Sequence, residues 1–149
     1  MSKETQNEQQ TKEMAMKAEF RDTKTANAFQ HYIHLKTALV NSNAKEAKSG
    51  AAMLGDTFEG DHEAKETAKA IAATEDLEKQ RELFSTLTAQ MEGVLKSALA
   101  SGEIYKQYCP MAFNNKGAYW FSDSKEIRNP YFGDKMLKCG SVKETIEKK

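Results

Sequence analysis

The sequence has few of the residues that usually bend or cross-link a chain, with two prolines and two cysteines among 149 residues, and it has one tryptophan. It also lacks an excess of either charge, because 22 Lys and Arg residues balance 22 Asp and Glu residues. That balance argues against a nucleic-acid binder, which carries a basic surplus or stripe. No apolar run approaches the length of a membrane-spanning helix. The length and the 39% hydrophobic share fit a single globular domain.

The motifs of common enzymes are missing as well. The chain has no C-x-x-C redox pair, no G-x-S-x-G, no P-loop and no dinucleotide-binding glycine pattern. A nucleophilic Cys–His pair would need one of the two cysteines to meet one of three histidines, and the spacing does not indicate this. We therefore do not expect an enzyme.

The first residues, MSKETQNEQQTKEM, are polar and show no periodicity. We expect residues 1–22 to form a disordered leader and residues 23–149 to form one domain. A tether of this kind would suit an exported protein whose signal was replaced by Met1, or the stretch after the acylated cysteine of a lipoprotein. The expected location is the periplasm or the outer membrane.

Residues 23–101 have the apolar periodicity of helices. Helices are predicted over 23–40, from Asn43 to about Phe58, weakly over 64–71 after a cap at Asp61, and over 75–100, with Gly102 as the final cap. Helices joined by short loops indicate a bundle. The predicted core comprises Phe29, Leu35, Leu39, Phe58, Phe84, Leu87, Met91 and Leu95.

Residues 102–149 differ from this helical half. Ile104, Tyr105 and Tyr108 alternate as in a strand, turn-forming residues follow, and aromatic residues are dense around Trp120, which we expect to be buried against the bundle. Ser141 and Glu144 suggest a short terminal helix over residues 142–146. The predicted fold class is mainly α, a four-helix bundle with a long, turn-rich aromatic C-terminal segment folded over it.

Both cysteines lie in this segment, each near a methionine. Cys109 and Met111 point to one face if the chain is extended, and Met136 and Cys139 share one face of a helical or tight turn. We expect the Asn-Pro and Gly turns between the cysteines to fold the segment back and bring Cys109 close to Cys139, so that four sulfur atoms can converge. Two thiolates and two thioethers form a soft donor set that selects Cu(I), whereas thioether is not a usual zinc ligand.

The simpler alternative is a Cys109–Cys139 disulfide, which would stabilise the loop by roughly 3–4 kcal/mol in the chain-entropy model. Composition alone favours that bridge, but a methionine beside each cysteine shifts the interpretation towards copper. His31 and His34, three residues apart in a predicted helix, are possible further donors, although a helix-surface histidine is more often solvated than a ligand.

The C-terminal motifs are Cys109-Pro110-Met111, Gly117 with Trp120, Asn129 to Gly133, and Met136 with Cys139-Gly140. They resemble the signature of a bacterial domain family known only as a domain of unknown function, and the resemblance extends over about residues 23–146. It implies an exported domain, found alone, in lipoproteins, or attached to periplasmic adaptors of copper/silver efflux pumps. We therefore expect a periplasmic or lipid-anchored module for Cu(I) or a similar soft metal. The alternative is a disulfide-stapled interaction domain that docks on an envelope or efflux partner.

Overall fold

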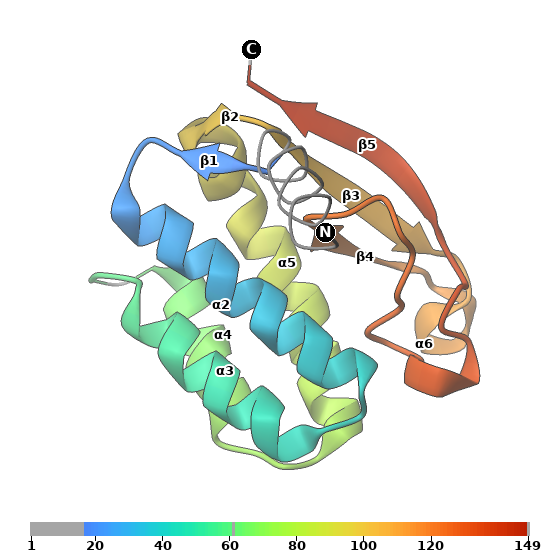
Figure 1. Cartoon of the computed structure of the whole chain (residues 1–149). Helices are drawn as coiled ribbons and strands as arrows, with labels where there is room; N and C mark the ends of the chain where they lie inside the picture. Colours follow the sequence, from blue (N-terminus) through green and yellow to red (C-terminus); the bar gives the residue numbers. More distant parts are fainter. Residues whose placement is uncertain (1–16, 61, 149) are drawn as a thin grey trace, which may run out of the picture.

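The computed structural model describes residues 17–60 and 62–148 (Figure 1). Residues 23–98, here called the helical part, contain α2 (Thr23–Val40), α3 (Ala44–Asp56), α4 (Glu63–Ala72) and α5 (Leu77–Ala98). Residues 99–148, here called the C-terminal part, contain most of the strands. The predicted disordered leader lies largely outside the described residues, while its end forms β1 (Glu19–Phe20).

The helices begin where short polar side chains accept backbone N–H groups. Asn43 accepts from Glu46 N at 3.1 Å, which confirms the cap predicted for the second helix. Asp76 accepts from the N–H groups of residues 78 and 79 at the start of α5. The cap predicted at Asp61 lies outside the described residues, and His62 accepts from Ala64 N at the start of α4.

Helices α2 to α5 pack against one another, with α2 contacting α3 and α5, and α4 contacting α3 and α5. Small residues allow close approach, since a Cβ on Gly50 would lie 3.4 Å from the Leu35 backbone. The predicted core is confirmed, with all eight of its members buried: Phe29, Leu35, Leu39, Phe58, Phe84, Leu87, Met91 and Leu95.

The C-terminal part contains a sheet as well as long connections. Strands β3 (Glu103–Cys109), β4 (Ala118–Ser122) and β5 (Ser141–Glu147) form an antiparallel sheet in the order β4-β3-β5. A second, two-stranded antiparallel sheet joins β1 to β2 (Leu99–Ser101). The connections carry a short α6 (Ala112–Asn115) and a 3₁₀ turn, η1 (Gly133–Lys135).

The predicted fold class is therefore wrong, because the described residues contain five helices and two antiparallel sheets in an α/β arrangement. The terminal helix predicted over 142–146 is strand β5 instead. Gly102 does not end α5 but turns the chain from β2 into β3 with a φ of 77°. These errors share one cause, since strands depend on partners far away in the sequence.

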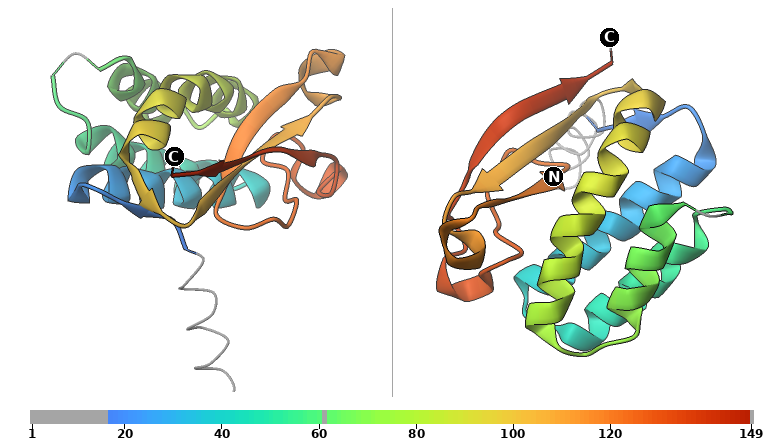
Figure 2. Two further views of the ribbon diagram at one scale, coloured as in Figure 1. Left: turned by 90° about the horizontal axis from the view of Figure 1, so that it is seen from above. Right: turned by 180° about the vertical axis from the view of Figure 1, so that it is seen from behind.

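Helices α2 and α5 lie next to the sheet, and α3 and α4 lie farther from it (Figure 2). Two tyrosine hydroxyls form hydrogen bonds with backbone groups of β4, one with an N–H and one with a carbonyl. Phe121 N–H donates to the Tyr32 hydroxyl at 2.9 Å, and the Tyr131 hydroxyl donates to Tyr119 O at 2.6 Å. Within the described ranges, none of the helices combines the length and apolarity needed to cross a membrane.

Candidate functional site

The two cysteines meet at one end of the three-stranded sheet. Cys109 is the last residue of β3, and Cys139 lies just before β5, the strand that pairs with β3. Their Sγ atoms are 2.8 Å apart, and the two thiols are not joined by a disulfide. The predicted approach of the cysteines is therefore confirmed. Cys109 is fully buried, whereas Cys139 is partly exposed.

Asn129 holds the segment that carries Cys139. Its backbone N–H donates to Leu137 O, and its Nδ2 donates to Cys139 O, both at 2.8 Å. Its Oδ1 accepts from the N–H groups of Tyr131 and Phe132 at 2.8 and 3.2 Å. Cys139 N–H closes a turn by donating to the carbonyl of residue 136 at 3.0 Å. One buried amide side chain thus fixes the position of the second thiol.

Gln107 and Trp120 fix the strand beneath that segment. Trp120 Nε1 donates to Gln107 Oε1 at 2.7 Å, and Gln107 Nε2 donates to Ser124 O at 3.0 Å. Trp120 is fully buried as predicted, and a Cβ on Gly140 would lie 2.9 Å from its ring. Only a residue without a side chain therefore fits between Cys139 and β5.

The aromatic contacts with the helices come from two other rings. Phe121 lies 6.1 Å from the Tyr32 ring, and Tyr131 lies 6.0 Å from the Phe84 ring, measured between centroids. Tyr131 also packs edge-on against Trp120 at 5.9 Å. Trp120 thus contacts the helical part through Tyr131, and the site is held against the bundle by a chain of rings.

The chain turns sharply after Cys109. Phe113, Asn114 and Asn115 all have positive φ angles, 53°, 56° and 69°, which form a left-handed turn. Each such residue costs about 1–2 kcal/mol, and Asn tolerates the conformation better than Phe. The Phe113 ring packs edge-on against Tyr131 at 5.1 Å and so offsets part of this cost. Strain of this kind clusters at functional sites, and here it begins four residues after Cys109.

The pair controls the acidity of the outer thiol. The hydrogen bond with Cys109 and partial burial raise the pKa of Cys139, while a backbone hydrogen bond from Met111 lowers it. The backbone of Met111 therefore lies against the second cysteine although Met111 follows the first. A bound cation would favour loss of protons from both thiols, because thiolate is the ligand form.

The methionines are placed less closely than the cysteines. Met136 is partly buried in the turn that ends at Cys139, and the Met111 side chain is 46% exposed. Convergence of all four sulfur atoms stays a prediction. His34 Nε2 pairs with Glu46 Oε1 at 2.8 Å between α2 and α3, and no described contact joins His31 or His34 to the thiols. Across residues 17–60 and 62–148, no group of three or more His, Cys, Asp or Glu side chains is placed to hold a metal ion.

Two basic residues of the helical part support the site and were not predicted. Arg81 Nε donates to Pro130 O and its Nη2 to Leu39 O, both at 2.8 Å. Lys36 is 6% exposed, and its Nζ donates to Ser122 Oγ at 3.4 Å. Burial lowers the pKa of Lys36 to about 8. The sequence offers no local signal for either contact, because both join α2 or α5 to a distant turn or strand.

Comparison with known proteins finds one family. A family model described as a protein of unknown function, DUF3347, matches residues 28–102, about half of the chain. The match covers nearly all of the helical part and stops before β3, so it does not include the thiol pair. No curated protein and no solved structure matches the chain.

Proposed function

The chain belongs to the DUF3347 family of proteins of unknown function, and we propose that it binds a soft metal ion, Cu(I) or a similar one, through Cys109 and Cys139. The observation that carries this proposal is that a buried and a partly exposed thiol meet at one end of the sheet, with Sγ atoms 2.8 Å apart. Two thiolates that share an ion stand farther apart than this, because a single metal–sulfur bond is about 2.3 Å long for zinc, so the two sulfur atoms would have to separate on binding. Soft thiolate donors select Cu(I) over harder ions. In this proposal Met111 and Met136 supply thioether donors beside the thiolates.

The donor chemistry fits a soft monovalent ion better than zinc. A structural zinc site takes four ligands from Cys, His, Asp and Glu. The described residues bring only two such side chains, Cys109 and Cys139, to this point, with methionines in the adjoining turns. Bound Cu(I) would be the protein's cargo. The residues of the chain would hold it, and Asn129 would keep the second thiolate in position.

We further propose that the protein acts in the cell envelope, in the periplasm or as an outer-membrane lipoprotein, and takes part in metal efflux or homeostasis. This part of the proposal is supported by the resemblance of residues 109–140 to the signature found on copper/silver efflux adaptors. Those residues lie outside the matched range 28–102. An efflux adaptor or another envelope protein is the proposed partner.

A second candidate function rests on the same distance. The Sγ–Sγ separation of 2.8 Å is less than about 1 Å longer than a covalent S–S bond, which is about 2.05 Å. A Cys109–Cys139 disulfide would staple β3 to the start of β5. The protein would then be an interaction domain that docks on an envelope or efflux partner without binding metal.

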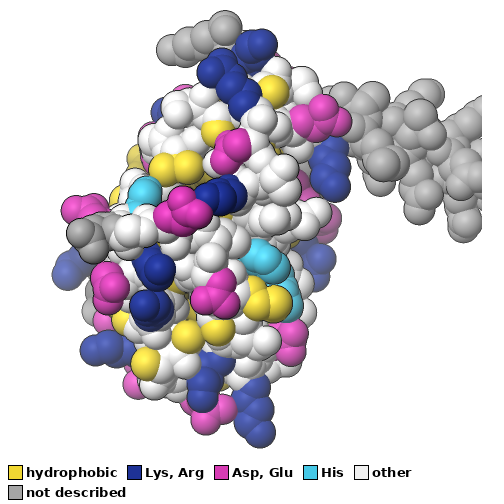
Figure 3. All heavy atoms as spheres, turned by 90° about the vertical axis from the view of Figure 1, so that its left-hand side faces the viewer, with side chains coloured by type: hydrophobic (Ala, Val, Ile, Leu, Met, Phe, Trp, Pro, Cys, Tyr) yellow, Lys and Arg dark blue, Asp and Glu magenta, His cyan; other side chains and the backbone are white. Residues whose placement is uncertain are grey.

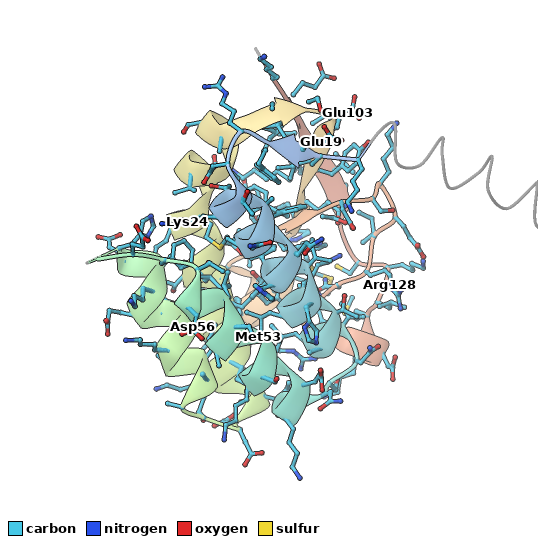
Figure 4. All side chains as sticks on the ribbon, turned by 60° about the vertical axis from the view of Figure 1, so that its left-hand side comes forward. Glu19, Lys24, Met53, Asp56, Glu103 and Arg128 are labelled. Atoms are coloured by element: carbon cyan, nitrogen blue, oxygen red, sulfur yellow. The ribbon has the colours of Figure 1, made fainter. Side chains whose placement is uncertain are left out.

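Competition for Cu(I) under anaerobic conditions separates the two candidates. The reduced protein is titrated against a calibrated Cu(I) chelator, and we expect the double variant Cys109→Ser/Cys139→Ser to lose competition. Met111→Leu and Met136→Leu should weaken it less, because thioether binds more weakly than thiolate. Met53→Leu is the matched control, since Met53 is 37% exposed on α3 in the helical part (Figure 4). If the wild type and the double variant compete equally poorly, the metal proposal is wrong. A thiol count near zero on air-exposed protein would then support the bridge.

A further inference from the structure

The two thiols of the pair differ in what can reach them. Cys109 is fully buried in the same core as Ala112, Ala118 and Trp120. Cys139 is partly exposed and follows Lys138, which is exposed. A reagent in solution can therefore approach the Sγ of Cys139 but not that of Cys109.

The backbone around the pair is fixed to different degrees. Cys109 is the last residue of the central strand β3 and is paired in register with Ala118 of β4. Cys139 lies outside the strands and is held by two backbone contacts, Asn129 Nδ2 to its carbonyl and its N–H to the carbonyl of residue 136. Cys139 is thus held by a side chain and a turn, whereas Cys109 is held by strand pairing.

From this arrangement we infer that the pair is a thiol–disulfide exchange site, in which Cys139 reacts first with a disulfide in solution and Cys109 reacts second. The Sγ of Cys139, as thiolate, attacks one sulfur of a partner R–S–S–R. A Cys139–S–S–R bond forms, the S–S bond of the partner breaks, and one RS⁻ leaves.

The second step completes the exchange inside the protein. The Sγ of Cys109, 2.8 Å away, attacks the Sγ of Cys139, so the intramolecular S–S bond forms and the second RS⁻ leaves. The two thiols of the protein are oxidised by two electrons in total. The partner disulfide is reduced to two thiols, which take up the two protons that the cysteines release.

This chemistry would regulate the proposed metal site, and that consequence rests on the proposed function. The oxidised pair has no thiolate and cannot hold Cu(I), whereas a thiol reductant would restore both ligands. The exchange itself does not depend on metal. A small-molecule disulfide or the disulfide of a protein could both supply the oxidant, because only the Sγ of Cys139 has to be reached.

Two single-cysteine variants test the order of reaction. Cys109→Ala keeps only the outer thiol, and Cys139→Ala keeps only the buried one. With oxidised glutathione under metal-free conditions, we expect Cys109→Ala to accumulate a mixed disulfide at least about tenfold faster than Cys139→Ala. The wild type should release two glutathione thiols per chain and end with an intramolecular disulfide, read by mass spectrometry.

Pulse alkylation of the reduced wild type checks the same order without a substitution. The peptide that contains Cys139 should be labelled before the peptide that contains Cys109. Equal rates for the two variants, a reversed order of labelling, or a wild type that stops at the mixed disulfide would each overturn the inference. If the exchange proceeds as described but the reduced protein does not compete for Cu(I), the proposed function fails and the exchange site stands.

Discussion

The helical part and the C-terminal part reach the same degree of burial by different means. In the helical part, rows of Leu, Ala, Phe and Met pack between neighbouring helices, and charged residues of both signs are interspersed over its outer face (Figure 3). In the C-terminal part, single polar side chains hold several distant groups. Gln107 bonds one ring and a loop, and Asn129 bonds a carbonyl and two N–H groups.

The difference shows where each part is sensitive to change. Apolar packing between helices tolerates volume-conserving substitutions, usually at a cost below about 1.5 kcal/mol. A polar side chain with several buried partners has no such substitute, because its loss leaves each partner without a hydrogen bond. The C-terminal part should therefore respond more sharply to single substitutions, and the thiol pair should respond with it.

Trp120→Ala tests the largest expected effect. The ring is fully buried, and its removal also leaves Gln107 Oε1 without a donor. We expect the free energy of unfolding to fall by about 3–5 kcal/mol, measured by denaturant titration. Tyr119→Ala on the same strand is the control, since Tyr119 is 41% exposed. Equal losses for the two variants would mean that the ring does not support the C-terminal part.

Lys36→Met tests the contact between α2 and β4 through the pH dependence of the free energy of unfolding. The pKa of Lys36 falls from 10.5 to about 8 on burial, while Asp123 and Glu126 raise it and Arg128 lowers it further. The unfolded chain thus binds more protons between pH 8 and 10.5, so the wild type should gain stability as pH rises through that window. The shift in the pKa of Lys36 corresponds to a gain in the free energy of unfolding on the order of 3 kcal/mol, at about 1.36 kcal/mol per pKa unit.

Denaturation curves at several pH values give the measurement for Lys36. The stability difference between the wild type and Lys36→Met should change across pH 8 to 10.5 and stay constant below it. Lys45→Met is the control, because Lys45 is exposed on α3. A difference that is the same at every pH would show that the ammonium is solvated at the contact between α2 and β4.

Asn129→Ala should lower the free energy of unfolding by about 1–3 kcal/mol, since it leaves the Cys139 carbonyl and two N–H groups without partners. The same variant should raise the rate at which the thiols react with a disulfide reagent, because the segment that carries Cys139 loses its support. Asn27→Ala is the control on an exposed face of α2. A loss of stability with unchanged thiol reactivity would show that Asn129 does not position the thiols.

Asn43→Ala should have the smallest effect and lower the free energy of unfolding by about 1 kcal/mol. It removes one N-cap hydrogen bond, which the Asn43 side chain accepts from Glu46 N. Thermal unfolding measures the loss. Thiol reactivity should not change, since this cap serves α3 alone. A change in thiol reactivity would show that the two parts are coupled more tightly than their contacts indicate.

Local patterns predicted the helical part well. The helix over 23–40 has the predicted bounds, and the fourth helix differs by two residues at each end. In the C-terminal part, the alternation at residues 104, 105 and 108 correctly indicated β3. Strand β4 was interpreted as loop, because its own residues do not show that they pair with β3. The capping pattern at Ser141 and Glu144 misled the prediction for β5, because pairing with β3 outweighs a local cap.

For the site, the turn residues between the cysteines predicted their approach. The contacts by which Asn129 and Gln107 position the site were not predictable, because the partners in those contacts lie 8 to 19 residues away. Arg81 and Lys36 reach the site from helices in which each resembles any solvated charge. Sequence patterns therefore located the thiol pair but not the side chains that position it.

The Tyr32 hydroxyl has a consequence for how the chain folds as it is made. This one phenol group bonds Thr88 Oγ1 at 2.7 Å and Phe121 N–H at 2.9 Å, with partners 56 and 89 residues further along the chain. During synthesis α2, α3 and α4 are complete before the first partner exists, and α5 is complete before the second. The Tyr32 hydroxyl therefore lacks its second partner until β4 has been made. The newly made helices carry a buried hydrogen-bond acceptor that a later strand of the same chain satisfies.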